Sequence, residues 1–576
     1  MKAFFTRQSS SFTYLNTTQF LGALNDNLFK LLIAYFCIDL IGEEHSTKIL
    51  ATAGAVFVIP FLLFSSTSGM LADRFSKRNI IVVCKAIEVI VMSLGVLVLW
   101  LQSIHGAYTI LFLMATQSAL FGPSKYGIIP ELVKIERISQ ANGLITMMTF
   151  LAIIIGTFLA SFITDVTYRN YIVVGTVCSL IAIAGLAASL CIEETPPSGS
   201  QKKIHPWFLL EIYKTTKAIK QQPTLLIAVL GSAYFLFAGA FIQLNIIPFA
   251  IQSLHLTDVQ GGYLFLLAAV GIGTGSMLAG KLSGKVVELG LVPIGGLGMV
   301  AGCFLLDAWS DQLFLIIPLV IVVGIFGGIY VIPLDAYIQV ASPKEQRGQV
   351  VATTNFFAFL GVLGASATLY TISEVIGLKA DKGFTFLGYL TLLMTGGVTA
   401  LVYHYLTRYL GMLMARLHFK IAVHGQENVS FEKPSIFVCH HTAWNDTLIM
   451  LGAQSIPMRF FMEHLQEHSS LLKRLYQLLK VTVIPSIELV EESPKDVKLI
   501  QKTLKKGISV CIFLDEVSDV YDVSKIRNSF ENTLQATSAS LLSVTIEKGE
   551  KQPSMSKFNR LLKKIRVPAR VVFAKI

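Results

Sequence analysis

A histidine and an aspartate separated by four residues, His441 and Asp446, form a pair that can do acid–base chemistry. At this spacing the carboxylate can meet the imidazole across a turn between a strand and a helix, and can hold the tautomer that accepts a proton. The imidazole would then act as a general base toward a substrate hydroxyl. Such pairs also arise by chance in long chains, so the alternative is a buried histidine in an unrelated domain.

The residues around this pair alternate between extended and helical patterns. Residues 435–439 form a short apolar run that is typical of a buried strand leading into the pair. Further strands are expected at residues 481–484 and 508–514, and helices at residues 471–479 and 494–505. This alternation favours an α/β domain, which we place at residues 425–576. Its basic tail, residues 548–575, has a partly helical charge spacing and is expected either to contact anionic lipid or to remain in solvent.

The rest of the chain has the composition of a membrane protein. Hydrophobic residues make up 53% of the 576 residues and charged residues only 14%. The mean hydropathy of +0.64 is too high for a soluble protein of this length. A membrane-spanning helix needs roughly 20 apolar residues. Twelve runs of suitable length are expected to be spans, at residues 18–41, 49–72, 80–101, 107–129, 140–164, 171–192, 224–250, 261–282, 290–308, 313–338, 350–374 and 384–409.

The spans divide into two halves of six, residues 1–192 and 224–409. A linker at residues 193–223 separates them and includes an amphipathic stretch that is expected on the membrane surface, and a connector at residues 410–424 leads to the α/β domain. The halves show internal similarity, because residues 70–78 correspond to 277–285 at an offset of 207, and Ile129-Pro130 corresponds to Ile332-Pro333 at an offset of 203. Two near-equal offsets indicate an internal repeat.

Basic residues are concentrated on one side of the predicted membrane. The net charge is +11, and clusters of Lys and Arg follow the second, fourth, sixth, eighth and tenth spans, whereas the loops on the other side carry mainly Asp and Glu. The positive-inside rule therefore predicts that both chain termini and the α/β domain are cytoplasmic. Because the bases lie at span ends, they favour contact with the lipid bilayer rather than with nucleic acid.

The loop after the second span carries a recognisable signature. The pattern Gly69-x3-Asp73-Arg74-x2-Lys77-Arg78 resembles the loop motif of the major facilitator superfamily, with Ser76 where glycine is usual. The resemblance implies a fold of 12 transmembrane helices arranged 6+6. In it the small Gly69 lets helices approach, and Asp73, Arg74, Lys77 and Arg78 form a cytoplasmic charge relay that steadies one conformation. The alternative is an ordinary positive-inside loop.

Several polar side chains lie inside the predicted spans, where they are costly and by default mark a transport pathway. In the first span Asp26 and Lys30 stand one helical turn apart and could neutralise each other. In the third span Lys85 and Glu88 could pair in the same way, or could reach the lipid headgroups. Glycine and proline are expected to break the fourth span near Lys125, and the tenth span offers Asp335 and Gln339. A zwitterionic substrate needs a cation and a carboxylate, which Lys125 and Asp26 could supply; the alternative is that these charges only pair internally.

Residues 20–30 and 121–131 closely resemble the bacterial lysophospholipid transporter family of the same superfamily, and the resemblance covers about residues 10–410. It implies inward flipping of lysophospholipids, such as lysophosphatidylethanolamine, across the bacterial cytoplasmic membrane. The residues that would bind this substrate are Asn25, Asp26, Asn27, Lys30, Lys125, Tyr126 and Glu131. No cofactor is implied, and the seven cysteines, which are far apart and form no Cys-x2-Cys pair, indicate no metal site.

Residues 425–428 and 436–446 resemble the first block of the glycerophospholipid acyltransferase family. The resemblance implies that His441 deprotonates a lysolipid hydroxyl and that Asp446 orients it, with acyl carrier protein or coenzyme A thioesters as acyl donors. A later block departs from the family, because Leu514-Asp515-Glu516 stands where Pro-Glu-Gly is usual. A carboxylate in place of that glycine would repel a substrate phosphate.

Three functional hypotheses follow. The first is a bifunctional protein that flips a lysophospholipid inward and reacylates it on the cytoplasmic side. The second is a lysophospholipid transporter whose acyltransferase-like domain is inactive and only binds lipid or a partner enzyme. The third is a facilitator of an unrelated solute.

Overall fold

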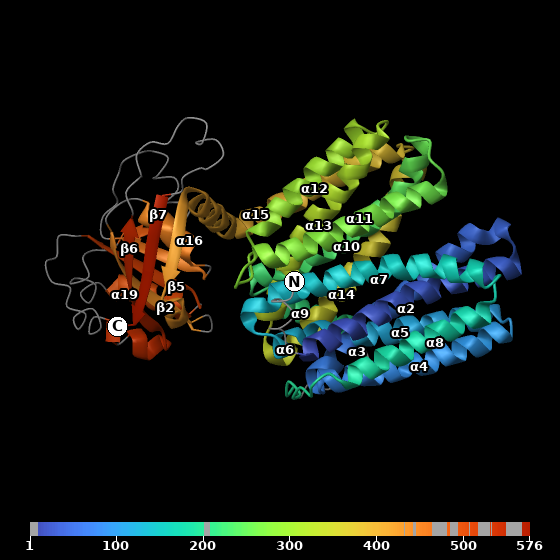
Figure 1. Cartoon of the computed structure of the whole chain (residues 1–576), viewed down its shortest axis with the longest axis horizontal. Coiled ribbons are helices and arrows are strands. Elements are labelled where there is room, and N and C mark those ends of the chain that lie inside the picture. Colours follow the sequence, from blue (N-terminus) through green and yellow to red (C-terminus); the bar gives the residue numbers. More distant parts are fainter. Residues whose placement is uncertain are drawn as a thin grey trace. The chain divides into compact units, whose positions relative to one another are not determined.

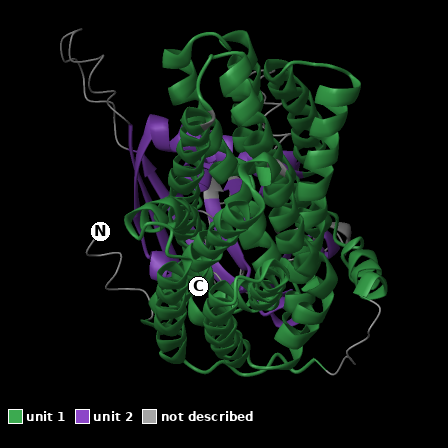
Figure 2. Ribbon diagram, turned by 90° about the vertical axis from the view of Figure 1, so that its right-hand side faces the viewer, with its two compact units in different colours: residues 1–401 green, residues 402–576 purple. Residues whose placement is uncertain are grey.

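The computed structural model describes residues 10–200, 208–430, 433–441, 445–454, 456–462, 481–483, 494–505, 507–515, 530–531, 533–548 and 567–575. The chain divides into two compact units, residues 1–401 and 402–576 (Figure 2). The boundary lies inside helix α15 (Ala380–His418), where Val402 departs from helical backbone angles. The connector expected at residues 410–424 is therefore not a separate segment, since the helix continues to His418 and a strand of the second unit follows it.

The first unit consists of long helices in two groups, coloured blue to cyan and green to yellow in Figure 1. The N-terminal group is α2 (Ser10–Ile41), α3 (Ser46–Arg74), α4 (Lys77–Trp100), α5 (Ile104–Gly127), α7 (Ile138–Val166) and α8 (Tyr171–Leu190). The C-terminal group is α10 (Pro223–Gln252), α11 (Asp258–Leu282), α12 (Leu291–Ala308), α13 (Leu313–Ala341), α14 (Arg347–Tyr370) and α15. Within the described residues, 12 helices are long and apolar enough to cross a membrane, which confirms the expected number of spans.

Helix α5 does not break where glycine and proline were expected to interrupt it. It continues through Pro123 to Gly127, and the short helix α6 (Ile129–Leu132) follows with Pro130 in its first turn. A proline inside a transmembrane helix removes one backbone donor, and packed neighbouring helices make that loss tolerable. Lys125 and Tyr126 therefore lie on the last turn of a continuous helix.

At one end the backbones of the two groups come into contact. We call this end the basic-loop end. It comprises the last turns of α3, α5, α11 and α13 and the first turns of α4, α7 and α14. A Cβ atom on Gly69 of α3 would lie 2.8 Å from the carbonyl oxygen of Gly348 on α14. A Cβ atom on Gly143 of α7 would lie 2.4 Å from the carbonyl oxygen of Ser276 on α11. Glycine at these positions permits an approach that a side chain would prevent.

The linker between the groups contains the amphipathic helix that the sequence predicts. Helix α9 (Phe208–Ile219) packs against α3, α10 and α14 and buries Ile212 and Ile219 against them. Leu209 and Tyr213 on its other face are exposed, as expected of a helix that lies at a membrane surface.

The second unit is built on a mixed sheet, with α16 and α19 labelled beside its strands in Figure 1. Its described strands are β1 (Phe419–His424), β2 (Ser435–His441), β3 (Met458–Met462), β4 (Thr482–Val483), β5 (Ser509–Asp515), β6 (Ser540–Lys548) and β7 (Val567–Lys575). They are ordered β1-β7-β6-β2-β5-β3-β4, and β6 and β7 are antiparallel while the other neighbouring pairs are parallel.

Both faces of this sheet are covered. Phe437 and Cys439 of β2 pack with helix α16 (Asp446–Ala453), whereas Ile436 and Val438 pack with helix α19 (Pro494–Lys505). This confirms an α/β region with a helix at residues 494–505. Residues 567–575 of the expected basic tail are instead part of the sheet, because they pair as strand β7 between β1 and β6. The helix expected at residues 471–479 lies outside the described residues.

Candidate functional site

A cavity of about 430 Å³ lies between the two groups of helices. Helices α2, α3, α4, α5 and α7 line it from the N-terminal group, and α10, α13 and α14 line it from the C-terminal group. This volume is within the range of sites for small organic ligands. Aromatic side chains form much of its wall, namely Phe57, Phe61, Phe121, Tyr126, Phe150, Phe235 and Phe359.

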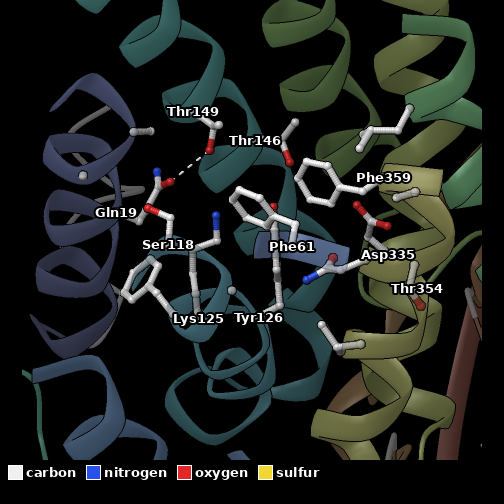
Figure 3. A pocket seen from close by; sticks show the side chains of 18 of the residues that line it. Gln19, Phe61, Ser118, Lys125, Tyr126, Thr146, Thr149, Asp335, Thr354 and Phe359 are labelled. Atoms are coloured by element: carbon white, nitrogen blue, oxygen red, sulfur yellow. Dashed lines mark hydrogen bonds between the residues drawn. The ribbon is translucent and has the colours of Figure 1, made fainter. Parts of the chain in front are cut away.

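Asp26 and Lys125 are two of the charged side chains that the sequence singled out and that the N-terminal group contributes to the cavity. The Asp26 carboxylate accepts a hydrogen bond of 2.7 Å from the Ser118 hydroxyl. The Lys125 ammonium lies 4.4 Å from the centre of the Tyr126 ring, and it forms no salt bridge with any carboxylate of the described residues. Figure 3 shows Lys125 and Ser118 on the same wall of the cavity. A cation without a salt bridge in a largely apolar cavity is a natural position for an anionic group of a ligand.

A buried ion pair stabilises this wall of the cavity. The Lys85 ammonium lies 2.5 Å from a Glu88 carboxylate oxygen, and both side chains are 2% exposed. The same carboxylate accepts hydrogen bonds from Asn25 and Gln117, each of 3.0 Å. Of the two alternatives left open by the sequence, Lys85 and Glu88 therefore pair rather than reach toward headgroups.

Replacing Glu88 with Gln should destabilise the protein strongly. The change leaves the Lys85 ammonium buried without its counter-charge, and breaking one partner of a buried ion pair costs about 3–5 kcal/mol. We expect a clear fall in the melting temperature of the detergent-purified protein. The double variant Lys85→Met/Glu88→Gln should recover part of this loss, because it removes the stranded charge. A single variant as stable as the wild type would show that this network contributes little.

The structure separates the residues that the sequence grouped as substrate-binding. Asp26, Asn27, Lys125 and Tyr126 line the cavity. The other three point elsewhere: Asn25 donates to Glu88, Lys30 lies over the Phe57 ring at 5.3 Å, and Glu131 pairs with Lys77 at 2.6 Å. No salt bridge joins Asp26 to Lys30 within the described part of the chain, because each side chain turns to a neighbouring helix instead.

The C-terminal group adds lining residues that the sequence did not place in the substrate-binding set. Asp335 of α13 lines the cavity and accepts a hydrogen bond of 2.6 Å from Ser232 of α10. Phe359 of α14 stacks on Phe61 of α3, with ring centroids 4.1 Å apart. Asp335 could be recognised as a candidate from the sequence, because it is an acid inside a predicted span. Phe61 and Phe359 could not be recognised, because aromatic residues are common throughout these helices.

The basic-loop end is held by polar contacts that include the predicted relay. The buried Asp73 carboxylate accepts hydrogen bonds from the backbone N–H groups of Gly348 and Gln349, at 2.6 and 2.9 Å. These donors are in the first turn of α14, where a carboxylate is favoured by the helix dipole. Asn142 and Gln339 exchange hydrogen bonds of 2.9 and 2.7 Å between α7 and α13. Contacts of Asp73 and Asn142 thus join the two groups at this end.

The remaining relay residues stay within the N-terminal group and its linker. Lys77 donates to Glu131 and to Ser198, each at 2.6 Å, and Arg78 donates to two backbone carbonyl groups at the end of α8. Arg74 lies over the Phe75 ring at 5.6 Å. These contacts tie the loop after α3 to neighbouring segments.

In the second unit, Asp446 is fully buried at the first turn of α16 and lies 2.5 Å from the Lys548 ammonium at the end of β6. The His441 side chain and residue Glu516 lie outside what the structure describes, so the predicted His441–Asp446 contact stays a prediction. Burial raises the pKa of the neighbouring Cys439 thiol, and Asp446 raises it further. A thiol held in its protonated form is a poor nucleophile.

Solved structures similar to this chain share the helical fold. The human organic anion transporter MFSD10 (TETRAN) has a TM-score of 0.57 at 17% identity, covering 67% of this chain and 99% of that one. The E. coli fucose:proton symporter FucP has a TM-score of 0.55 at 13% identity, covering 67% and 98%. At these identities the likeness shows the fold alone.

Proteins that are similar to this chain in sequence are transporters as well. The lysophospholipid transporter LplT of Klebsiella pneumoniae subsp. pneumoniae is 25% identical over 369 residues, covering 62% of this chain and 87% of that protein. LplT of Salmonella typhimurium is 27% identical over 372 residues, covering 63% and 88%. A family model described as Major Facilitator Superfamily matches residues 15–366, which excludes the sheet region. This match spans well over half of the chain, which therefore belongs to the Major Facilitator Superfamily.

Proposed function

We propose that this transporter moves lysophospholipids across the membrane, inward in the orientation that the positive-inside rule predicts. The observation that carries the proposal is Lys125, a cation without a salt bridge among the described residues, set in a cavity walled by aromatic rings. A lysophospholipid has a phosphate that such a cation would bind and a single acyl chain that apolar walls would accept. The distant similarity to LplT proteins supports the same substrate class.

The contacts at the basic-loop end support a direction of access. Asp73 and the Asn142–Gln339 pair join the two groups there, and Gly69 and Gly348 bring α3 and α14 into backbone contact. If this end is cytoplasmic, the structure corresponds to the state that receives lipid from the outer leaflet. Release to the inner leaflet would require these contacts to separate, while others form at the opposite end.

The acyltransferase-like region allows two proposals. Strand β2 ends at His441 and helix α16 begins at Asp446, so the two residues stand at the end of a strand and at the start of a helix, as a His-x4-Asp site requires. Asp446, however, is paired with Lys548, which offsets the charge that would stabilise a protonated histidine. This ion pair favours a region that binds lipid or a partner enzyme over one that reacylates the transported lipid.

A two-step vesicle assay separates these activities. Purified protein is reconstituted, labelled lysophosphatidylethanolamine is added outside, and albumin removes the lipid that remains in the outer leaflet. We expect the protected fraction to rise with time, with no conversion to diacyl lipid from either acyl carrier protein or coenzyme A thioesters. Conversion that is lost in His441→Ala would contradict an inactive region and establish the bifunctional protein, while leaving the transport proposal intact.

A further inference from the structure

The charges that line the cavity are distributed unequally between the two groups of helices. The N-terminal group contributes Asp26, Lys85 and Lys125, and Lys85 is neutralised by Glu88. The C-terminal group contributes one charged lining residue among those described, Asp335. On one wall neither Asp26 nor Lys125 forms a salt bridge within the described residues, so Lys125 is the cation that a ligand can meet there, and the opposite wall carries the Asp335 carboxylate.

Asp335 and Lys125 come from different groups and do not satisfy each other. No salt bridge joins them within the described residues, and the Asp335 carboxylate is held by the Ser232 hydroxyl of its own group. In Figure 3 the side chains of Phe61 and Tyr126 lie between Lys125 and Asp335. The Asp26 carboxylate, in contrast, belongs to the same group of helices as Lys125 and accepts a hydrogen bond from Ser118 of α5.

We infer that Asp335 recognises the ammonium group of an aminophospholipid headgroup whose phosphate is bound by Lys125. This deepens the proposed function and rests on it, because it names the headgroup class that the same cavity selects. A charge-assisted hydrogen bond from a primary ammonium to a carboxylate is stronger than one from a neutral hydroxyl. Lysophosphatidylethanolamine would therefore be preferred over lysophosphatidylglycerol, which has the phosphate but ends in hydroxyl groups.

The placement also gives the headgroup a role in the transport cycle. Lys125 is on α5 and Asp335 is on α13, so a headgroup that contacts both joins the two groups across the cavity. A lipid without the ammonium would contact Lys125 and leave the Asp335 carboxylate without a cation. Discrimination should thus appear in the rate of transport as well as in binding, because only the bridging ligand interacts with both moving parts.

The test compares two lysolipids in the same reconstituted vesicles. For the wild type, Asp335→Asn and Asp335→Glu, we measure the ratio of the initial rates for lysophosphatidylethanolamine and lysophosphatidylglycerol. We expect the ratio to fall about tenfold in Asp335→Asn, which corresponds to the loss of one charge-assisted contact, and to be largely retained in Asp335→Glu. Asp307→Asn is the matched control, since Asp307 is on α12, pairs with Lys382 and does not line the cavity.

The outcomes distinguish this inference from the proposal on which it rests. Equal reduction of both rates in Asp335→Asn, with the ratio unchanged, would overturn the inference and assign Asp335 to the conformational change or to ion coupling. A similar change of ratio in Asp307→Asn would overturn it as well. If the wild type moves neither lysolipid, the proposed function itself fails, and the inference fails with it.

Discussion

Replacing Lys125 with Met should reduce lysophospholipid transport about a hundredfold. The side chains have similar length, but the variant loses the cation that would bind the phosphate in the proposed function, and would leave that anion in a cavity with aromatic walls. Hydrogen bonds to charged groups are worth about 1.5–3 kcal/mol, and the upper value applies where water is excluded. The measurement is the initial rate at which labelled lysolipid becomes protected from albumin in reconstituted vesicles.

Two further variants serve as controls for this result. Lys125→Arg keeps the positive charge and should retain a measurable part of the rate. Lys134→Met removes an exposed base from the loop that follows the same helix and should transport like the wild type. Undiminished transport in Lys125→Met would show that the phosphate is bound elsewhere.

A methyl group on Gly69 should reduce transport about tenfold by opening the basic-loop end. The added Cβ would lie 2.8 Å from the Gly348 carbonyl oxygen and 2.6 Å from the Ala352 Cβ, so α3 and α14 must separate. Overpacking of this kind costs about 1–3 kcal/mol. Separation also stretches the hydrogen bonds from the α14 backbone to Asp73. The closed state is then populated less, and the cycle slows.

The same helix provides a matched control. A Cβ atom on Gly54 of α3 meets no atom within 4 Å, so Gly54→Ala should leave the transport rate unchanged. A cysteine in place of Thr146, which lines the cavity, should be labelled faster from the basic-loop side in Gly69→Ala than in Gly54→Ala. Equal transport and equal labelling in the two variants would mean that the contact between Gly69 and Gly348 does not control access.

The sequence predicts the individual charged positions well, because charge inside a span is costly and therefore stands out. Asp26 and Lys125 were found in this way, and both line the cavity. Their partners were not predictable from spacing along one helix. Asp26 accepts from Ser118, and Lys30 faces Phe57, so contacts between helices replace the expected pair one turn apart.

Long-range pairing limits what can be predicted for the second unit. The helix at residues 494–505 and the strand that ends in His441 follow from local pattern, and the structure contains both. Lys548 was read as the start of a basic tail, whereas strand order places it beside Asp446. Register between strands that are distant in the chain depends on the whole sheet, and no local motif encodes it.

The most direct test of the central claim is the initial rate of lysophosphatidylethanolamine translocation in vesicles that contain the purified wild-type protein. Albumin extraction measures how much labelled lipid has left the outer leaflet. The account predicts a rate well above that of protein-free vesicles, saturation with substrate, and competition by unlabelled lysophosphatidylethanolamine. A rate equal to that of protein-free vesicles, from protein that is folded and inserted, would contradict it.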